Sequence, residues 1–418
     1  MTELLSPAGN FEKMRAAIRY GADAVYLAGR CFGMRSAADN FDNEELSAAV
    51  QYAHERGKKV YLTVNTMPHG AEYPALCRYL DAMREIPVDA MIVTDLGVLA
   101  TIREILPEMA IHISTQSSIV SPAAAKAWAA TGASRLVLAR ELTLDEVRAI
   151  RAAVDPAVEL EAFVHGSMCV SYSGRCMLSN HFTGRDANRG ACTQPCRWNY
   201  TYTIEEEKRP DSPLPVIENE HGTFVMSSKD MCMLRHIPEL IEAGVTSFKI
   251  EGRMKSAYYT AVITNAYRMA IDAYRRDGAA YRFDEGWYRE VESVSHREYC
   301  TGYWFDDPRE NPQLCRDPGY IREKAYYATV EARGAELPGV PAETGEGVLC
   351  RLIQRNKMEL GCKAELLTPG RVGIPFAVKE LYGEDGTPIT ATPHPLMVFY
   401  ARLPEEAAGG DILRAGEE

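Results

Sequence analysis

Residues 59–105 read KVYLTVNTMPHGAEYPALCRYLDAMREIPVDAMIVTDLGVLATIREI, and they contain two consecutive strand–helix units. The runs at 59–64 and 90–93 are short, apolar and rich in β-branched residues, as expected of buried strands. The segments at 73–84 and 96–105 carry apolar residues at the spacing of one helix face. Strands that alternate with helices predict an α/β fold in which helices cover a parallel sheet.

The same alternation continues on both sides of this stretch. Further strands are expected at 3–5, 24–27, 111–113, 135–138 and 160–164, and further helices at 12–20, 43–56, 122–130 and 143–153. An eighth strand is expected at 247–250, followed by a helix at 255–276. Eight such units predict a (β/α)8 TIM-like barrel with an insertion at about 165–245, after strand 7. An insertion at that point belongs to the C-terminal face of the barrel, where barrel enzymes carry out their chemistry.

The composition of the chain changes near residue 330. Residues 331–345 are rich in Gly, Pro and Glu, which predicts a linker after a barrel domain at 1–330. Beyond the linker, residues 346–418 alternate short β-prone runs with turn residues, which predicts a small C-terminal β-barrel domain.

Charge and composition exclude several classes of protein. The 418 residues are 46% hydrophobic and carry a formal net charge of −12, so binding of nucleic acid by bulk electrostatics is not expected. The N-terminus lacks the pattern of a secretory signal, and no apolar run reaches the length of a membrane span. We therefore expect a cytoplasmic protein that does not enter a membrane. Eleven cysteines in a reducing compartment point to metal binding or catalysis rather than disulfides.

Five of these cysteines form a cluster with the spacing C-x6-C-x15-C-x3-C-x35-C: Cys169, Cys176, Cys192, Cys196 and Cys232. Four thiolates suit either zinc or an iron–sulfur cluster. Structural zinc sites usually use CxxC pairs, and none is present, so the irregular spacing favours iron and sulfide. The alternative is that these cysteines are buried small apolar residues.

The stretch EAFVHGSMCVSYSGRCMLS at 161–179 fits the motif E-x-F-x2-G-[SA]-[LIVM]-C-x4-G-x-C-x-[LIVM]-S at every constrained position. This motif defines peptidase family U32, long catalogued as collagenase-like peptidases, and the chain therefore resembles that family. The segments GRDANRGACTQPCRW at 184–198 and KIEGRMKS at 249–256 also resemble it.

The resemblance implies an oxygen-independent hydroxylase that carries a [4Fe–4S] cluster. Members similar to this chain act on a wobble uridine of tRNA, a cytidine of ribosomal RNA or a quinone ring, and the RNA-directed members take the hydroxyl group from prephenate. Length and the C-terminal module resemble the branch that makes 5-hydroxyuridine in tRNA. The implied partners are the tRNA anticodon loop and prephenate as co-substrate, with a second U32-family chain as a further candidate. By motif position the metal ligands are Cys169, Cys176, Cys192 and Cys232, with Cys196 as a rival for the third place.

Other polar residues are candidates for the active site. His165 precedes the first cysteine and has the side chain best suited to move protons near neutral pH, although it could simply hydrogen-bond the loop. Lys249, Glu251 and Arg253 alternate out of strand eight, which places them together at the barrel mouth, and Glu251 is a second candidate catalytic group. Arg253 with Arg140 or Arg175 could clamp the carboxylates of prephenate, since guanidinium groups bind carboxylates in a bidentate way. The alternative is that these charges form ion pairs at the rim.

The remaining candidates bind substrate or RNA. Asn65 and Gln116 end strands three and five, where they could contact substrate or fix loops. Basic and aromatic residues of the insertion could bind an extruded RNA base or balance the charge of a cluster: Arg185, Arg189, Arg197 and Trp198. A peptidase remains the alternative function, although HGSMC is not GxSxG and no HExxH is present.

Overall fold

The computed structural model describes residues 2–34, 39–169, 171–173, 175–198, 217–219, 222–224, 228–305, 320–322, 324–340 and 346–416. The chain divides into two compact units. The first comprises Met1–Ile18, Ala22–Lys255 and His296–Tyr320, and the second comprises Arg19–Gly21, Ser256–Ser295 and Ile321–Glu418.

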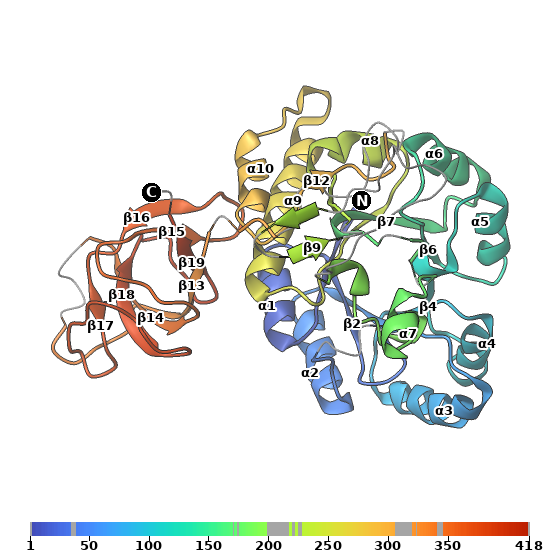
Figure 1. The fold of residues 1–418 in the computed structure, drawn as a ribbon, viewed down its shortest axis with the longest axis horizontal. Coiled ribbons are helices and arrows are strands. Elements are labelled where there is room, and N and C mark those ends of the chain that lie inside the picture. The colour runs from blue at the N-terminus through green and yellow to red at the C-terminus, as the bar shows by residue number, and fades with distance from the viewer. Residues whose placement is uncertain are drawn as a thin grey trace. The chain divides into compact units, whose positions relative to one another are not determined.

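The first unit is built on a closed parallel barrel (Figure 1). Its strands are β1 (Glu3–Pro7), β2 (Ala24–Ala28), β3 (Lys59–Val64), β4 (Ala90–Val93), β5 (Ile111–Ile113), β6 (Arg135–Val137), β7 (Glu159–Ser167) and β11 (Ser247–Ile250). They pair in that order, and β11 also pairs with β1, which closes the sheet. The predicted (β/α)8 architecture is therefore confirmed.

Helices follow the barrel strands along the chain, and those of the first unit lie on the outside of the strands (Figure 1). They are α1 (Phe11–Arg19), α2 (Asn43–His54), α3 (Tyr73–Ala82), α4 (Leu96–Ile105), α5 (Pro122–Ala129), α6 (Leu144–Ala153) and α8 (Ile237–Glu242). Short 3-10 turns occur at η1 (Gly70–Glu72), η2 (Met83–Glu85), η3 (Thr115–Ser117) and η6 (Leu234–His236). No helix in the described ranges is both long and apolar enough to cross a bilayer.

The start of α6 shows how local sequence sets a helix boundary. Thr143 Oγ1 accepts a hydrogen bond from the Glu146 amide, and the Glu146 carboxylate accepts one from the Thr143 amide, which makes a capping box.

We expect Thr143→Ala to lower the free energy of unfolding by about 1 kcal/mol, because the first turn loses its side-chain acceptor. Urea denaturation would measure the loss. Thr143→Ser keeps the acceptor and should behave like the wild type, and equal stability of all three proteins would contradict the role of the cap.

The barrel interior contains a buried ion network. The Arg135 guanidinium is 2% exposed and contacts Glu3 Oε1 at 2.6 Å, Glu159 Oε2 at 2.7 Å and Glu161 Oε2 at 3.0 Å. Burial alone would lower the pKa of Arg135, but the neighbouring carboxylates outweigh it and raise the pKa. Arg135 is therefore held in its charged form at the centre of the barrel, and Glu161 extends the network to Lys249.

The insertion after β7 adds strands to one side of the barrel. β10 (Asp230–Cys232) pairs antiparallel with the end of β7, and β12 (Tyr299–Cys300) pairs with β10. The insertion also holds α7 (Leu178–Thr183), η4 (Ala187–Arg189), η5 (Pro195–Arg197), and a hairpin of β8 (Ile217–Asn219) and β9 (Gly222–Phe224). Gly166 of the motif has φ 105°, a conformation that favours glycine. Gly174 of the motif lies outside the described residues.

The second unit holds α9 (Ala257–Asp277), η7 (Gly278–Ala280), α10 (Glu285–Glu292) and an antiparallel sheet. The strands of the sheet are β13 (Tyr326–Arg333), β14 (Val348–Gln354), β15 (Lys363–Leu367), β16 (Ile374–Ala377), β17 (Leu381–Tyr382), β18 (Val398–Leu403) and β19 (Ile412–Ala415). They pair in the order β16-β15-β19-β13-β14-β18-β17, which forms a half-barrel. The predicted C-terminal β module is thus confirmed as a separate antiparallel sheet.

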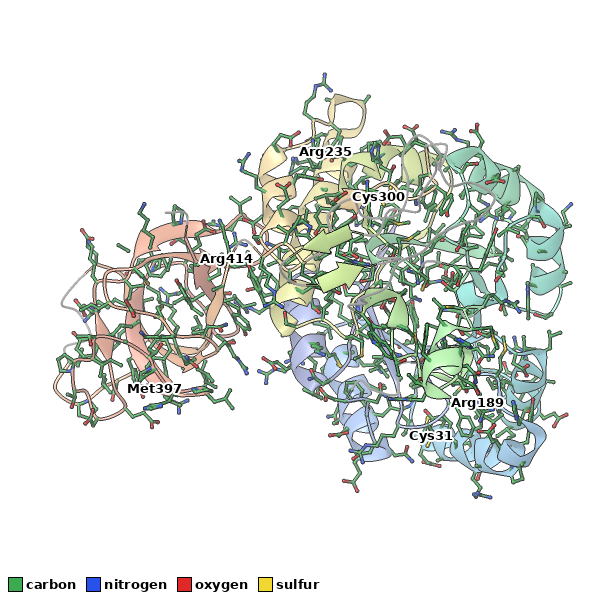
Figure 2. All side chains as sticks on the ribbon, in the orientation of Figure 1. Cys31, Arg189, Arg235, Cys300, Met397 and Arg414 are labelled. Carbon is green, nitrogen blue, oxygen red and sulfur yellow. The ribbon has the colours of Figure 1, made fainter. Side chains whose placement is uncertain are left out.

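The sheet of the second unit begins before the expected domain boundary. β13 starts at Tyr326, within the range 1–330 that the sequence assigned to the barrel domain, and it pairs with both β14 and β19. Residues 341–345 of the expected linker lie outside the described residues. Arg414 of β19, labelled in Figure 2, is 1% exposed and contacts Glu290 and Glu365, both at 2.7 Å. This buried ion pair joins α10 to the sheet.

Candidate functional site

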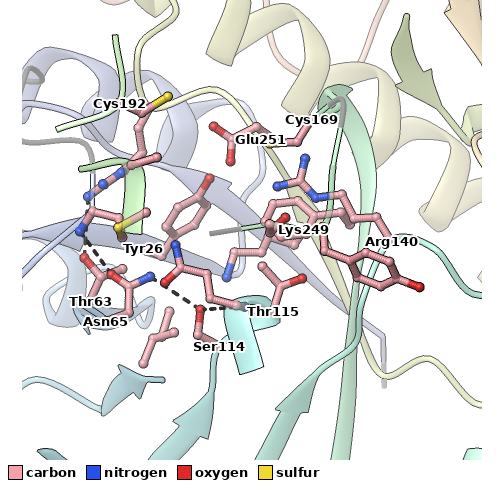
Figure 3. A pocket seen from close by; sticks show the side chains of 18 of the residues that line it. Tyr26, Thr63, Asn65, Ser114, Thr115, Arg140, Cys169, Cys192, Lys249 and Glu251 are labelled. Carbon is pink, nitrogen blue, oxygen red and sulfur yellow. Dashed lines mark hydrogen bonds between the residues drawn. The ribbon is translucent and has the colours of Figure 1, made fainter. Parts of the chain in front are cut away.

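A cavity of about 110 Å³ lies at the C-terminal ends of the barrel strands (Figure 3). This is the end at which barrel enzymes place their active sites. Strand and loop residues from nearly every βα unit line it: Tyr26, Met34, Thr63, Asn65, Ile92, Ser114, Thr115, Gln116, Arg140, Phe163, Cys169, Tyr172, Ser173, Cys176, Ala187, Cys192, Lys249, Glu251 and Arg253. The cysteine-bearing loop thus shares one cavity with polar groups of the barrel.

Lys249 supplies a fixed positive charge to this cavity. Its side chain is 5% exposed, and Nζ donates a hydrogen bond to Glu161 Oε1 at 2.6 Å. Nζ also lies 4.4 Å from the centre of the Tyr26 ring and 5.3 Å from that of Phe163. Because Glu161 is fully buried and also binds Arg135, the ammonium group is held in one place.

Two arginines add to the positive charge. Arg140 is 8% exposed, donates from Nη1 to the Ser167 carbonyl oxygen at 2.6 Å, and stacks 4.2 Å from the Phe163 ring centre. Its Nε is buried and has no hydrogen-bond partner among the described residues. Arg253 is 3% exposed and donates to Thr63 Oγ1 at 3.5 Å. The three cations and Glu251 make a site suited to an anionic ligand.

Asn65 and Gln116 also line the cavity, and Figure 3 shows Asn65 near Thr63 and Ser114. Asn65 Oδ1 accepts a hydrogen bond from the Met34 amide at 3.1 Å, and Asn65 Nδ2 donates to Ser114 Oγ at 3.4 Å. Gln116 Oε1 accepts from Thr94 Oγ1 at 3.2 Å. Both amides therefore fix loops at the cavity, and their contact with substrate stays a prediction.

Three cysteines line the cavity: Cys169, Cys176 and Cys192. Cys196 does not line it. Burial raises the pKa of the Cys196 thiol, Arg197 opposes this effect, and the three other thiols raise the pKa further. The fifth, Cys232, is 7% exposed, lies in β10 and does not line the cavity.

The chemistry of the cysteine side chains can be compared with that of a metal site. Three thiol groups line one cavity, and thiolates are the ligands that iron–sulfur clusters use. The Gln194 amide donates to Cys192 Sγ at 3.4 Å, and hydrogen bonds to ligand sulfurs tune the potential of such clusters. In the described parts of the chain, no three His, Cys, Asp or Glu side chains are placed to hold one metal ion.

His165 lies next to the cavity without lining it. Burial lowers its pKa to about 3, and His296 and Lys255 lower it further, despite the opposing Asp230 carboxylate. Its Nε2 lies 3.5 Å from the Tyr299 hydroxyl, and its carbonyl oxygen accepts from the Glu251 amide at 2.8 Å. His165 therefore supports the backbone of Glu251, and its role in proton transfer stays a prediction.

The basic residues of the insertion divide into two groups. Arg189, labelled in Figure 2, pairs with Glu72 at 2.8 Å. Arg197 turns inward, donating to Gln194 Oε1 at 2.9 Å and to the Met168 carbonyl oxygen at 3.4 Å. In contrast, Arg175 and Arg185 are exposed. Arg189 and Arg197 therefore have partners within the chain, and their contact with RNA stays a prediction. Arg175 does not line the cavity.

Exposed aromatic rings surround the cysteine-bearing loop. Tyr172 lines the cavity and is 46% exposed. Phe182 is 51% and Trp198 is 38% exposed, with their ring centres 6.4 Å apart. Trp198 Nε1 donates to the Thr193 carbonyl oxygen at 3.0 Å, which fixes the indole.

Several residues that line the cavity were not selected in the sequence analysis. Tyr26 and Thr63 lie within strands, and Ser114, Thr115 and Ser173 are common loop residues. Their position just before or after the end of a barrel strand is the signal that could have identified them, because all strand ends converge at the mouth.

Comparison with known proteins identifies the family of both the barrel and the C-terminal module. The family model described as "Peptidase family U32" matches residues 9–313, and that of the "Peptidase family U32 C-terminal domain" matches residues 339–414. A Bacillus subtilis protein named "tRNA hydroxylation protein P1" is 36% identical over 415 residues, covering 99% of this chain and 95% of the relative.

Two further relatives carry different names. The Escherichia coli "23S rRNA 5-hydroxycytidine C2501 synthase" is 41% identical over 271 residues, covering 65% of this chain and 39% of the relative. A Porphyromonas gingivalis protein named "Collagenase" is 35% identical over 404 residues, covering 90% of this chain and 95% of the relative.

Proposed function

The chain belongs to peptidase family U32, and we propose that it hydroxylates C5 of a wobble uridine in tRNA, with prephenate as the hydroxyl donor and a [4Fe–4S] cluster as cofactor. RNA hydroxylation is named for relatives that span nearly the whole chain, including the C-terminal module. The observation that carries the proposal is the cavity itself, in which three cysteines meet three cations at the barrel mouth.

The cysteines would hold the cofactor. Cys169, Cys176 and Cys232 are three of the proposed ligands, and either Cys192 or Cys196 takes the third place in the motif. When bound, a cluster supplies one-electron chemistry, which a pyrimidine C5 needs because its hydrogen is not acidic. The amide of Gln194 stabilises the charge on Cys192 Sγ through its hydrogen bond at 3.4 Å.

The cations would bind the donor. Prephenate carries two carboxylates, and Arg140, Lys249 and Arg253 face one cavity. The unpartnered Nε of Arg140 is a buried donor that a carboxylate would satisfy. In the overall exchange, a base C–H and a donor C–OH become a base C–OH and a donor C–H. The base is thereby oxidised by two electrons and the donor is reduced by two.

The exposed rings would receive the RNA. Single-stranded bases stack on aromatic side chains, and Arg175 and Arg185 add exposed positive charge beside Tyr172, Phe182 and Trp198. A flipped base could then reach the cavity that Tyr172 lines.

We expect Trp198→Ala to weaken binding of a tRNA anticodon stem-loop by about 5- to 150-fold, because stacking contributes roughly 1–3 kcal/mol per base. Fluorescence anisotropy with a labelled stem-loop would measure the dissociation constant. Phe305→Ala is the matched control, since Phe305 is 43% exposed but its ring packs on His236, away from the Phe182 and Trp198 rings. Equal losses in the two variants would contradict a specific stacking surface.

Nucleoside mass spectrometry tests the function. In cells that lack this chain and any paralogue, tRNA should contain no 5-hydroxyuridine, and the wild-type gene should restore it. An unchanged level of 5-hydroxyuridine in tRNA would overturn the proposal. Loss of 5-hydroxycytidine from ribosomal RNA instead would identify ribosomal RNA, and not tRNA, as the substrate.

Peptidase activity is the second candidate, because one relative of nearly full length is named a collagenase. A nucleophile needs an adjacent base, but no histidine is found among the described residues that line the cavity. Cleavage of gelatin by anaerobically purified wild-type protein, lost in Cys169→Ala, would favour the peptidase.

A further inference from the structure

The carbonyl oxygen of Met168 joins segments that are far apart in the sequence. Met168 is 2% exposed and directly precedes Cys169. Its oxygen accepts a hydrogen bond from Ser228 Oγ at 2.6 Å and another from Arg197 Nη2 at 3.4 Å. Arg197 directly follows Cys196, and Ser228 lies just before the strand that contains Cys232. One oxygen atom therefore connects all three cysteine-bearing segments.

A buried ion pair holds Ser228 in this position. Arg297 Nη1 donates to Ser228 Oγ at 3.3 Å, while Arg297 Nη2 and Nε donate to Asp230 Oδ1 at 2.6 and 3.1 Å. The Arg297 amide donates to Asp230 Oδ2 at 3.2 Å. Ser228, Asp230 and Arg297 are 0%, 1% and 2% exposed.

The charges in this network are well matched. Burial alone would raise the pKa of Asp230, but Arg297 and Lys255 outweigh it and lower the pKa. A fully buried pair with this many hydrogen bonds has little freedom to move. Burying the Arg297–Asp230 ion pair costs desolvation free energy, and a buried ion pair contributes little net stability compared with apolar residues of similar volume. Stability alone therefore does not explain why these two residues are charged.

We propose that Arg297, through Asp230 and Ser228, is a positioning residue that fixes the Met168 carbonyl group and so holds the cysteine-bearing segments in the arrangement that retains the cluster. This inference rests on the proposed cofactor, but it concerns residues that the family motif does not contain. Groups outside the ligand shell of a metal site commonly change affinity 10- to 100-fold when they are replaced.

The test is Ser228→Ala in the full-length protein, purified and reconstituted anaerobically with iron and sulfide. Iron and sulfide per chain, the rate of iron loss to excess chelator, and the midpoint potential followed by visible absorbance are measured. We expect iron loss to be about 10-fold faster than in the wild type, together with a shifted potential. Arg197→Gln removes the second donor to the same oxygen and should accelerate the loss in the same direction.

Ser247→Ala is the matched control, because Ser247 is also fully buried and donates to Glu3 Oε1 at 2.8 Å inside the barrel, away from the cysteines. It should leave iron loss and potential unchanged. The inference is overturned if Ser228→Ala retains iron at the wild-type rate and potential, or if Ser247→Ala accelerates the loss equally, since the effect would then be one of general stability. A wild-type protein that takes up no iron would instead overturn the proposed cofactor, and this inference with it.

Discussion

Replacing Cys169 with serine is expected to abolish both cluster retention and RNA hydroxylation. Cys169 lines the cavity together with Cys176 and Cys192. A serine hydroxyl is a poor ligand for iron, so one corner of the cluster would lose its protein bond. We expect iron per chain and hydroxylation of tRNA to fall by at least about 100-fold, since even groups beyond the ligands change affinity by 10- to 100-fold.

The same substitution at other cysteines provides the control and tests the third ligand. Cys77 is exposed on α3 and does not line the cavity, so Cys77→Ser should keep full iron content. Cys192→Ser and Cys196→Ser form a pair in which only the variant at the true third ligand should lose iron. Cys169→Ser protein with wild-type iron, sulfide and hydroxylation would end the proposal that these thiols hold a cluster.

The barrel could be predicted from the sequence because its signals are local and repeated. Every barrel strand is a short apolar run, and helix starts such as Thr143 carry their own capping residues. The pairing of β10 with β7 and of β12 with β10 could not be predicted, because strands of three and two residues show no periodicity. The start of β13 was missed for a related reason: its place in the C-terminal sheet depends on partners more than 14 residues away along the chain, in β14 and β19.

The site was predictable where barrel geometry decides it. Lys249, Glu251 and Arg253 were expected together at the mouth because alternate residues of one strand end face one side, and all three line the cavity. The partners of Arg189 and Arg197 within the chain, Glu72 and the Met168 carbonyl oxygen, could not be predicted because they come from distant parts of the sequence. Sequence alone shows a basic cluster and cannot show which charges are already neutralised.

The second large effect is expected from Arg135→Met. The substitution leaves Glu3 and Glu161 buried without the guanidinium that they share, and breaking a buried ion pair costs about 3–5 kcal/mol. Chemical denaturation followed by tryptophan fluorescence would measure the lower free energy of unfolding. Because Glu161 also binds Lys249, the cavity should be perturbed as well, which a weaker affinity for prephenate would report.

The pH dependence of stability distinguishes an ionic role from a packing role for Arg135. Burial alone would raise the pKa of Glu3, but Arg135 outweighs it and lowers the pKa below the ordinary 4.5. A carboxyl group with a lowered pKa stabilises the fold above its unfolded pKa, and this contribution is lost as the pH falls through the folded value. The wild type should therefore lose stability on acidification below about pH 4.5, and Arg135→Met should lose less.

Arg84→Met is the control for both measurements. The side chains of Arg84 and Asp81 are 51% and 70% exposed, so their ion pair should change the free energy of unfolding by no more than about 0.5 kcal/mol. Arg135→Met could instead lose no more unfolding free energy than Arg84→Met and keep the acid sensitivity of the wild type. The interior charges would then contribute nothing to the stability of the fold, and the fixed position of Lys249 would need another explanation.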